Sequence, residues 1–399
     1  MSNNLSDRIA FLQESATLAM AAKAREYKAK GIDVISLSLG EPDFKTPKHI
    51  QEGAKQAIDE GKYFAYPPVN GYLDLRQAIV KKLKDENNID YTPDQIVVSN
   101  GAKQSIANVM FALLNPGDEV IIYSPYWVSY AAIVELAEAT PVYIKGGLEN
   151  DFKANADQLA AAISEKTKIV IYSSPCNPTG AVFTKEELEA MAEVLRKHEN
   201  IYVISDEIYE HINYTNQHAS IASIEGMYDK TITVNGFAKG FAMTGWRVGY
   251  IAAPAWIAKG CNKMQGQITS ANCSIAQRAA LTALTSDLAP TREMAAAYLN
   301  RRNMVYELLK DIPGVKVNLP KGAFYFFPDV SSYFGKSNGE TVVNNASDFC
   351  MYILDHAHVS LVTGDAFGDP NCVRLSYAAS EEDLKEAIKR IKEVLSKLN

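Results

Sequence analysis

Apolar positions in the middle of the chain form short β-branched runs that alternate with helical patterns. Such runs, bounded by turn residues, are typical of strands, and their near-continuous apolar character is typical of a sheet covered on both faces. One helical pattern begins at Thr184 and carries Glu187 three residues on, the spacing of a capping box. The alternation predicts an α/β domain with a mostly parallel, seven-stranded sheet flanked by helices. The predicted strands cover residues 96–99, 120–123, 142–144, 169–172, 201–204, 232–234 and 248–252.

The pattern changes after about Ser286. A long helix is predicted there, followed by a strand over 322–327, by strands near Val359 and Val373, and by a final amphipathic helix with Ser380 as its N-cap. This order is typical of a smaller α+β domain.

Length and composition fit this division. A soluble chain of 399 residues suggests two or three domains. We expect an N-terminal arm that shares in the small domain over 1–45, a large domain over 46–286 and a small C-terminal domain over 287–399. The net charge of −7 with scattered basic residues argues against nucleic-acid binding, and no apolar stretch is long enough to predict a membrane span.

The cysteines and histidines show no pattern of metal binding. The five cysteines are odd in number, far apart and without a Cys-x-x-Cys pair, so we expect free thiols in a reducing cytoplasm. The histidines have no metal-ligand spacing, and we expect no metal site.

One lysine stands in an otherwise uncharged stretch. From residue 231 to residue 246, Lys239 alone is charged. Apolar surroundings lower the pKa of an amine and free its lone pair, which is what a Schiff-base lysine needs. The alternative is a lysine whose stem crosses an apolar surface to reach solvent.

Polar residues follow two of the predicted strands. Asn177 lies in S-S-P-C-N-P-T-G after strand 169–172, and Asp206 and Tyr209 lie in S-D-E-I-Y-E after strand 201–204. Ligands of open α/β sheets gather at the carboxyl ends of strands, so these side chains are candidates for a binding site. The alternatives are an ordinary Asn-Pro turn and a helix N-cap at Asp206.

Two further segments point to the same edge of the sheet. N-G-A-K-Q, residues 100–104, follows a strand and begins a helical pattern, where free N–H groups bind phosphate well. Pro125-Tyr126-Trp127 is expected to open the helix after the next strand, and Trp127 is either a ligand-stacking ring or a core residue.

Together these motifs resemble those of the class I/II aminotransferases, which are fold-type-I pyridoxal-phosphate (PLP) enzymes, and most nearly the bacterial one-beta branch of the aspartate aminotransferases. The resemblance covers nearly the whole chain. The motifs stand in the family's order: S-L-G-E-P-D-F (38–44), Y-P-P-V-N-G (66–71), N-P-G-D-E-V (115–120), S-P-Y-W-V-S-Y (124–130), N-P-T-G (177–180), S-D-E-I-Y-E (205–210), K-G-F-A-M-T-G-W-R-V-G-Y (239–250) and V-R-L-S-Y-A (373–378).

The resemblance implies roles around the ring of PLP. Lys239 would hold the cofactor as a Schiff base and carry the substrate's α-proton. Asp206 would pair with the pyridine nitrogen and keep it protonated. Asn177 and Tyr209 would hydrogen-bond the phenolic oxygen, and Trp127 would stack on the ring.

It also implies a phosphate site and a substrate site. Arg247 would clamp the phosphate as a bidentate fork. The other phosphate ligands would be Gly101, Ala102 and Lys103, with Tyr66 reaching the phosphate of a neighbouring subunit in a homodimer. Arg374 and the backbone of Gly40 would hold the substrate's α-carboxylate, beside Trp127 and Asn177, with Ser15 and Thr17 near the substrate's side chain.

The implied reaction is ping-pong transamination between an L-amino acid, with aspartate as first choice, and a 2-oxo acid such as 2-oxoglutarate. The sequence departs from the family pattern at three places. Gly236 and Ala238 stand where many relatives have serine, and residues 104–114 lack the lysine or arginine that some relatives have late in this helix. Gln13 and Glu14 replace a Lys-Pro of prephenate-accepting members. These departures bear on the choice of substrate and not on Lys239.

Other reactions stay open on the same fold. They are an aromatic or broad-specificity aminotransferase, a β-lyase, a decarboxylase and a cyclopropane-forming synthase. A non-catalytic PLP-sensing regulator is disfavoured, because only about 35 residues precede S-L-G-E-P-D-F. A dehydrogenase is disfavoured too, since no G-x-G-x-x-G follows a strand.

Overall fold

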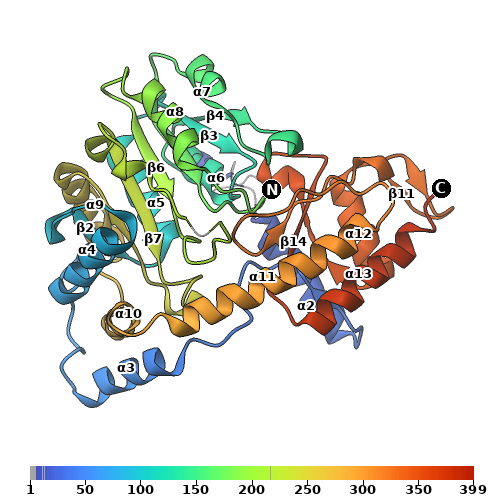
Figure 1. The fold of residues 1–399 in the computed structure, drawn as a ribbon, viewed down its shortest axis with the longest axis horizontal. Helices are drawn as coiled ribbons and strands as arrows, with labels where there is room; N and C mark the ends of the chain where they lie inside the picture. Colours follow the sequence, from blue (N-terminus) through green and yellow to red (C-terminus); the bar gives the residue numbers. More distant parts are fainter. Residues whose placement is uncertain (1–5, 11, 13, 216) are drawn as a thin grey trace.

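A computed structural model of the chain describes residues 6–10, 12, 14–215 and 217–399. All seven predicted strands are present, and they form one sheet in the order β2-β8-β7-β6-β5-β3-β4 (Figure 1). The strands are β2 (Ile96–Ser99), β3 (Glu119–Ser124), β4 (Thr140–Lys145), β5 (Thr167–Ser173), β6 (Tyr202–Asp206), β7 (Thr231–Gly236) and β8 (Gly249–Ala252).

Five neighbouring strands, β4, β3, β5, β6 and β7, pair in parallel, whereas β8 runs antiparallel to both β7 and β2. The expectation of a mostly parallel sheet is therefore confirmed. Because β8 turns back beside β7, the connection between them lies at the carboxyl end of β7. That connection contains Lys239 and Arg247.

Both faces of the sheet are covered, which explains the continuous apolar strands. Alternate residues of β3 show the division: Val120 and Ile122 pack with helices α5, α6 and α9, whereas Ile121 packs with α7 and α8. Helices α3, α4 and α10 cover that second face over β2 and β8. The helices are α3 (Lys48–Asp59), α4 (Leu73–Asn87), α5 (Ala102–Leu113), α6 (Ser129–Leu136), α7 (Ala156–Ala162), α8 (Lys185–Leu195), α9 (Ala255–Ile268) and α10 (Ser274–Thr285).

The C-terminal part contains a small sheet in the order β13-β14-β9, and most of a second core, which residues such as Leu37 and Tyr209 also join. The long helix α11 runs beside it (Figure 1). The N-terminal strand β1 pairs in parallel with β12. The domain boundaries themselves stay a prediction. The elements outside the large sheet are α1 (Asp7–Ala10), α2 (Ala16–Ala29), β1 (Ile35–Ser36), α11 (Ala289–Lys310), β9 (Tyr325–Phe326), β10 (Lys336–Ser337), β11 (Val342–Val343), α12 (Ala346–Ala357), β12 (Val359–Ser360), β13 (Val362–Thr363), β14 (Val373–Ser376) and α13 (Glu381–Leu395).

Two predicted boundaries are wrong. The strand expected over 322–327 is reduced to β9, because Gly322 instead contacts the loop after β5: its N–H donates to Gly180 O at 3.0 Å. A Cβ on Gly322 would lie 2.6 Å from Pro175, so this close approach requires glycine. Trp127 does not open a helix either, since α6 begins two residues later.

The predicted capping box of α8 is confirmed, and its removal is expected to be measurable. Thr184 Oγ1 accepts from the backbone N of Glu187 at 3.2 Å, and the Glu187 carboxylate accepts from the backbone N of Thr184 at 2.8 Å. Thr184→Ala should lower the free energy of unfolding by about 1 kcal/mol in urea titrations. Thr184→Ser keeps the acceptor oxygen and should stay near wild type; equal losses in both variants would contradict the capping role.

Candidate active site

The carboxyl edge of the large sheet brings most of the predicted site residues together. Asp206 ends β6, Asn177 lies in the loop after β5, and Lys239 and Arg247 lie in the connection after β7. Arg374 comes from β14 of the small sheet and hydrogen-bonds Asn177. The site is therefore built where the strands of the large sheet end, as expected for an open α/β sheet.

Lys239 has a partly buried side chain whose amine is surrounded by protein. Its Nζ donates to the backbone oxygen of Gly40 at 2.5 Å and lies 5.6 Å from the ring centroid of Tyr209. Burial, reinforced by the charges of Arg374 and Arg247, lowers the pKa of Lys239 to about 8. At pH 7 about a tenth of the amine is then neutral, far more than for an ordinary lysine with a pKa of about 10.4, which suits a nucleophile and a proton carrier.

Asp206 is a buried carboxylate, 4% exposed. Its Oδ2 accepts from the hydroxyl of Tyr130 at 2.6 Å, and its Oδ1 accepts from the backbone N of Ile208 at 3.2 Å. Burial raises the pKa of Asp206 to about 6, although the hydrogen bond from Tyr130 opposes this rise. A turn rather than a helix follows β6, so the helix N-cap alternative is wrong.

Arg374 is 2% exposed and is held in one orientation by the groups around it. Its Nη1 donates to Asn177 Oδ1 at 2.9 Å and its Nη2 to Ser38 O at 2.6 Å. The guanidinium carbon lies 4.6 Å from the ring centroid of Tyr325, and the hydroxyl of Tyr325 contacts that of Tyr209 at 2.5 Å. The Nε atom of Arg374 is buried without a hydrogen-bond partner among the described residues, as expected of a group that awaits a ligand.

The start of α5 meets Arg247. Gly101 is the N-cap of α5 with φ of 81°, and a Cβ there would lie 2.4 Å from Arg247 Nη2, so the position requires glycine. Arg247 donates to the backbone oxygens of Asn100 at 3.2 Å and Thr244 at 3.1 Å. Ala102 and Lys103 begin the helix, and Lys103 Nζ lies 5.0 Å from the ring centroid of Trp127. A helix N-terminus and a guanidinium side by side suit a phosphate group.

The cations of this site have no carboxylate partners. Within the part of the chain that the structure describes, 26 ion pairs are formed, and none includes Lys103, Lys239, Arg247 or Arg374. Arg374 is buried and Lys239 half-buried, whereas Lys103 and Arg247 are exposed. Buried cations are normally paired, so the first two are the unusual ones. Four cations without carboxylate partners around one sheet edge fit anionic ligands, a phosphate near Arg247 and a carboxylate near Arg374.

Three predicted residues stay apart from this cluster. Tyr66 is 93% exposed and contacts none of it within this chain. Ser15 and Thr17 lie half-buried at the start of α2, where Ala16 packs against the cluster that contains Phe367, itself 4.8 Å from Arg374. Gln13 lies outside the described residues, and its neighbour Glu14 is exposed.

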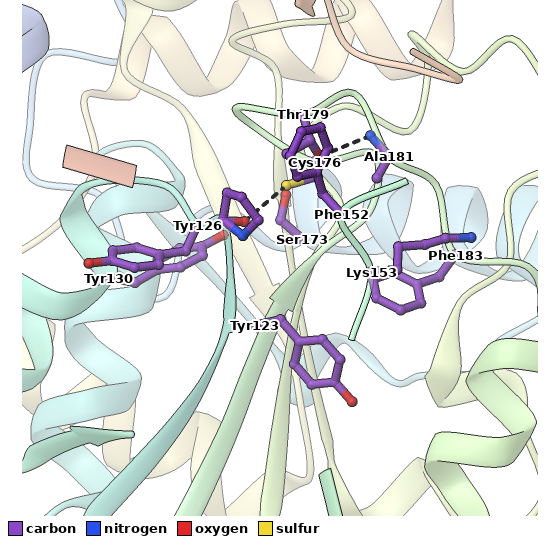
Figure 2. Close-up of a pocket in the computed structure, with 11 residues that line it drawn as sticks. Tyr123, Tyr126, Tyr130, Phe152, Lys153, Ser173, Cys176, Thr179, Ala181 and Phe183 are labelled. Atoms are coloured by element: carbon purple, nitrogen blue, oxygen red, sulfur yellow. Dashed lines mark hydrogen bonds between the residues drawn. The ribbon is translucent and has the colours of Figure 1, made fainter. Parts of the chain in front are cut away.

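A very small cavity lies behind the N-P-T-G loop (Figure 2). Its volume is about 10 Å³, enough for one water at most. The Sγ of Cys176 donates to Pro125 O at 3.6 Å, and its backbone N donates to Ala181 O at 2.8 Å. The loop that carries Asn177 is thus tied to the segment before Trp127 and packs with little free space.

Sequence reasoning missed a buried charged network on the opposite side of the S-D-E-I-Y-E segment. Glu207, 0% exposed, accepts from His218 Nε2 at 2.8 Å and from Ser220 Oγ at 2.6 Å. Glu210 contacts the ammonium of Lys82 and accepts from Asn235 at 2.7 Å. The available signal was the pair Glu207 and Glu210, two acids three positions apart directly after a buried strand.

This network carries a pH-dependent part of the stability. Burial opposes charge on His218, but the carboxylates of Glu207 and Glu210 outweigh burial and the repulsion from Lys82, so the pKa of His218 is raised. The charged histidine therefore stabilises the fold fully below the unfolded-state pKa of about 6.5. That contribution is lost as the pH rises through the higher folded-state pKa.

We expect the unfolding free energy of wild type to fall, relative to that of His218→Gln, as the pH rises from about 6 upward. Urea unfolding of both proteins at matched pH values measures the difference, in which all other titrating groups cancel. Parallel curves for the two proteins would show that His218 does not change its charge in this way.

Comparison with known proteins agrees with the fold and the site. Residues 32–391 match the family model of aminotransferases of class I and II. A bifunctional aspartate aminotransferase and glutamate/aspartate-prephenate aminotransferase of Petunia hybrida is 47% identical over 98% of this chain and 83% of its own length.

Two solved structures are close. The aspartate aminotransferase of Rhizobium meliloti has a TM-score of 0.96 at 38% identity, with both chains fully covered. That of Thermus thermophilus with maleate has a TM-score of 0.93 at 39% identity, covering 98% of this chain and all of the other.

The chain therefore belongs to the class I and II aminotransferases. It is a fold-type-I transaminase that uses PLP as its cofactor. Among the described helices, none combines the length and the apolar character needed to cross a membrane.

Proposed function

We propose that the chain moves an amino group between L-aspartate and a 2-oxo acid such as 2-oxoglutarate. The observation that carries the proposal is the set of unpaired cations around Lys239 and Asp206, which fits a phosphate and an α-carboxylate at once. The names of the relatives support aspartate, and the Thermus enzyme binds maleate, a dicarboxylate.

PLP, when bound, supplies an electron sink for the electrons of the bond that the α-proton leaves. In the proposed roles, Asp206 keeps the ring nitrogen protonated, and Asn177 and Tyr209 donate hydrogen bonds to the phenolic oxygen of the ring. Trp127 covers one face of the ring. The ring thereby has a fixed position relative to Lys239.

Lys239 would carry the proton. Its amine, held at the backbone oxygen of Gly40, takes the α-proton at Nζ and returns it at the far end of the same electron system. A pKa of about 8 keeps the two protonation states close in free energy at working pH, so both transfers stay feasible.

The remaining residues would bind the phosphate of the cofactor and the α-carboxylate and side chain of the substrate. Arg247 and the start of α5, with Gly101, Ala102 and Lys103, bind the phosphate. Arg374 offers a fork to the α-carboxylate, next to the backbone of Gly40. Ser15 and Thr17 lie nearer to the position of the substrate's side chain.

The test is a single-turnover panel of amino acids on the PLP-loaded enzyme. Aspartate and glutamate should convert the bound cofactor to its amino form, seen as a change of its absorbance, and 2-oxoglutarate should restore it. Release of product from a β-substituted amino acid without any oxo acid would instead favour a β-lyase. Faster conversion by phenylalanine or tyrosine than by aspartate would favour an aromatic aminotransferase.

Helix α5 does not supply a cation for the side-chain carboxylate of a dicarboxylic substrate. Residues 104–114 contain no lysine or arginine, and the amide of Gln104 is already occupied: it accepts from Asn100 N at 2.7 Å and donates to Thr269 Oγ1 at 2.7 Å. A broad-specificity enzyme that also accepts prephenate is therefore the second candidate, supported by the printed activities of the Petunia relative. Competition between aspartate and prephenate's amino product in the same panel separates the two.

We further propose a cytoplasmic homodimer with shared sites. The free cysteines support a reducing compartment. Phe64 and Tyr66 are 70% and 93% exposed, and Ile268 at the end of α9 is 57% exposed. Ala65 O accepts from Ser274 at the start of α10, so this apolar segment is held in place and suits a partner subunit.

Tyr66→Phe should weaken the binding of PLP to the apo enzyme about tenfold, because one hydrogen bond to a charged phosphate is lost. Titration of apo enzyme with PLP measures the effect, and sedimentation reports the dimer. Tyr63→Phe, in the same segment, is the matched control, since Tyr63 packs on Arg278 of its own chain. Equal affinities for wild type and Tyr66→Phe would mean that the hydroxyl does not reach a phosphate.

A further inference from the structure

Asp206 receives a hydrogen bond from a side chain that has no part in the proposed mechanism. The hydroxyl of Tyr130, on α6, donates to Oδ2 at 2.6 Å, and the other donor to the carboxylate is the backbone N of Ile208 at 3.2 Å. An ionised carboxylate accepts about four hydrogen bonds. Positions therefore remain for the ring nitrogen of the cofactor beside the bond from Tyr130.

The direction of this hydrogen bond is fixed. Tyr130 is 1% exposed, and burial first, with the charge of Asp206 second, raises the pKa of Tyr130 well above its ordinary value. The phenol thus keeps its proton at every pH at which the enzyme works. An oxygen that holds its proton and faces a carboxylate at 2.6 Å is a permanent donor.

The bond matters because Asp206 is close to losing its charge. Burial raises the pKa of Asp206 to about 6, and the donation from Tyr130 is the largest effect that acts against burial. Without the donation, the neutral form would become more common near neutral pH. A neutral carboxylic acid cannot hold a protonated ring nitrogen by charge.

We propose that Tyr130 is a positioning residue that keeps the carboxylate of Asp206 ionised and turned toward the ring nitrogen of the cofactor. The inference rests on the role proposed for Asp206. The arrangement also joins two tasks, since Trp127 packs edge-on to Tyr130 with ring centroids 5.5 Å apart. One short segment then supplies both the ring that covers the cofactor and the donor that fixes its counter-charge.

The test uses Tyr130→Phe, which keeps the ring and removes only the hydroxyl. Tyr123→Phe is the matched control: Tyr123 is a buried tyrosine whose hydroxyl has no hydrogen-bond partner among the described residues. Figure 2 shows both side chains, with their hydroxyls pointing to different sides of the cavity. Each holoenzyme is loaded with PLP that carries ¹⁵N in the ring, and the ¹⁵N chemical shift and the pH profile of kcat/KM are measured.

In Tyr130→Phe the ¹⁵N shift should move toward the value of an unprotonated ring. The acidic limb of kcat/KM should move to higher pH, and kcat should fall roughly tenfold to a hundredfold, the range for a lost hydrogen bond to a charged group. Tyr123→Phe should leave all three near wild type. A ¹⁵N shift and a pH profile equal to those of wild type in Tyr130→Phe would overturn the proposal, even if its melting temperature fell.

Asp206→Ala separates this inference from the function on which it rests. If it deprotonates the ring while Tyr130→Phe does not, the role of Asp206 stands and that of Tyr130 falls. If the ring nitrogen stays protonated in Asp206→Ala, both are overturned.

Discussion

Lys239→Ala is expected to lower the turnover of transamination at least about a thousandfold, roughly 4 kcal/mol of transition-state stabilisation. The change removes the amine that forms the covalent link and the group that carries the α-proton, so two contributions are lost together. Binding of PLP should persist, because Arg247, the start of α5 and Asp206 are untouched. Steady-state assays and titration of the apo enzyme with PLP measure the two properties separately.

Borohydride reduction gives an independent measurement of the same assignment. Reduction of the wild-type holoenzyme should fix the cofactor on the peptide that contains Lys239, and mass spectrometry identifies that peptide. Lys230→Ala is the matched control, since Lys230 stands immediately before β7 on the same segment. Label on any other lysine, or a Lys239→Ala variant that keeps normal turnover, would refute the assignment.

The fold could be predicted because its strands have a plain physical signature. Buried strands such as β5 and β7 must be apolar on both faces, and a short run bounded by turn residues leaves few other structures. The segment 322–327 has the same composition, but its course is set by the close approach of Gly322 to the loop after β5. A contact between segments about 140 residues apart leaves no local pattern.

The site could be predicted where a residue type is unusual in its segment. Lys239 stands alone in an uncharged stretch, and Asp206 ends a buried strand, so each is costly to bury without a purpose. Tyr130 and Tyr325 give no such signal, because a buried tyrosine is ordinary in a core. Their hydroxyl contacts with Asp206 and Tyr209 depend on how α6 and the small sheet pack against the large one, which the sequence does not state.

Arg374→Lys is expected to lower kcat/KM at least about a hundredfold, roughly 2.7 kcal/mol, for aspartate, glutamate and neutral amino acids alike. Every α-amino acid has the α-carboxylate that the guanidinium would grip, so the loss should not depend on the side chain. Lysine keeps the charge but loses the planar fork. The change also releases Asn177 Oδ1 and Ser38 O, the two groups that orient the arginine.

The structure sharpens this expectation. Arg374 is buried and makes no ion pair within the described residues, so it is not a surface arginine paired with a neighbouring acid. Arg302→Lys serves as the control, because Arg302 is an arginine of helix α11 that donates to Pro320 O and has no proposed role in ligand binding. Kinetics over a panel of substrates decide the matter: a loss confined to dicarboxylic substrates would mean that Arg374 binds the side-chain carboxylate, and that the α-carboxylate is held elsewhere.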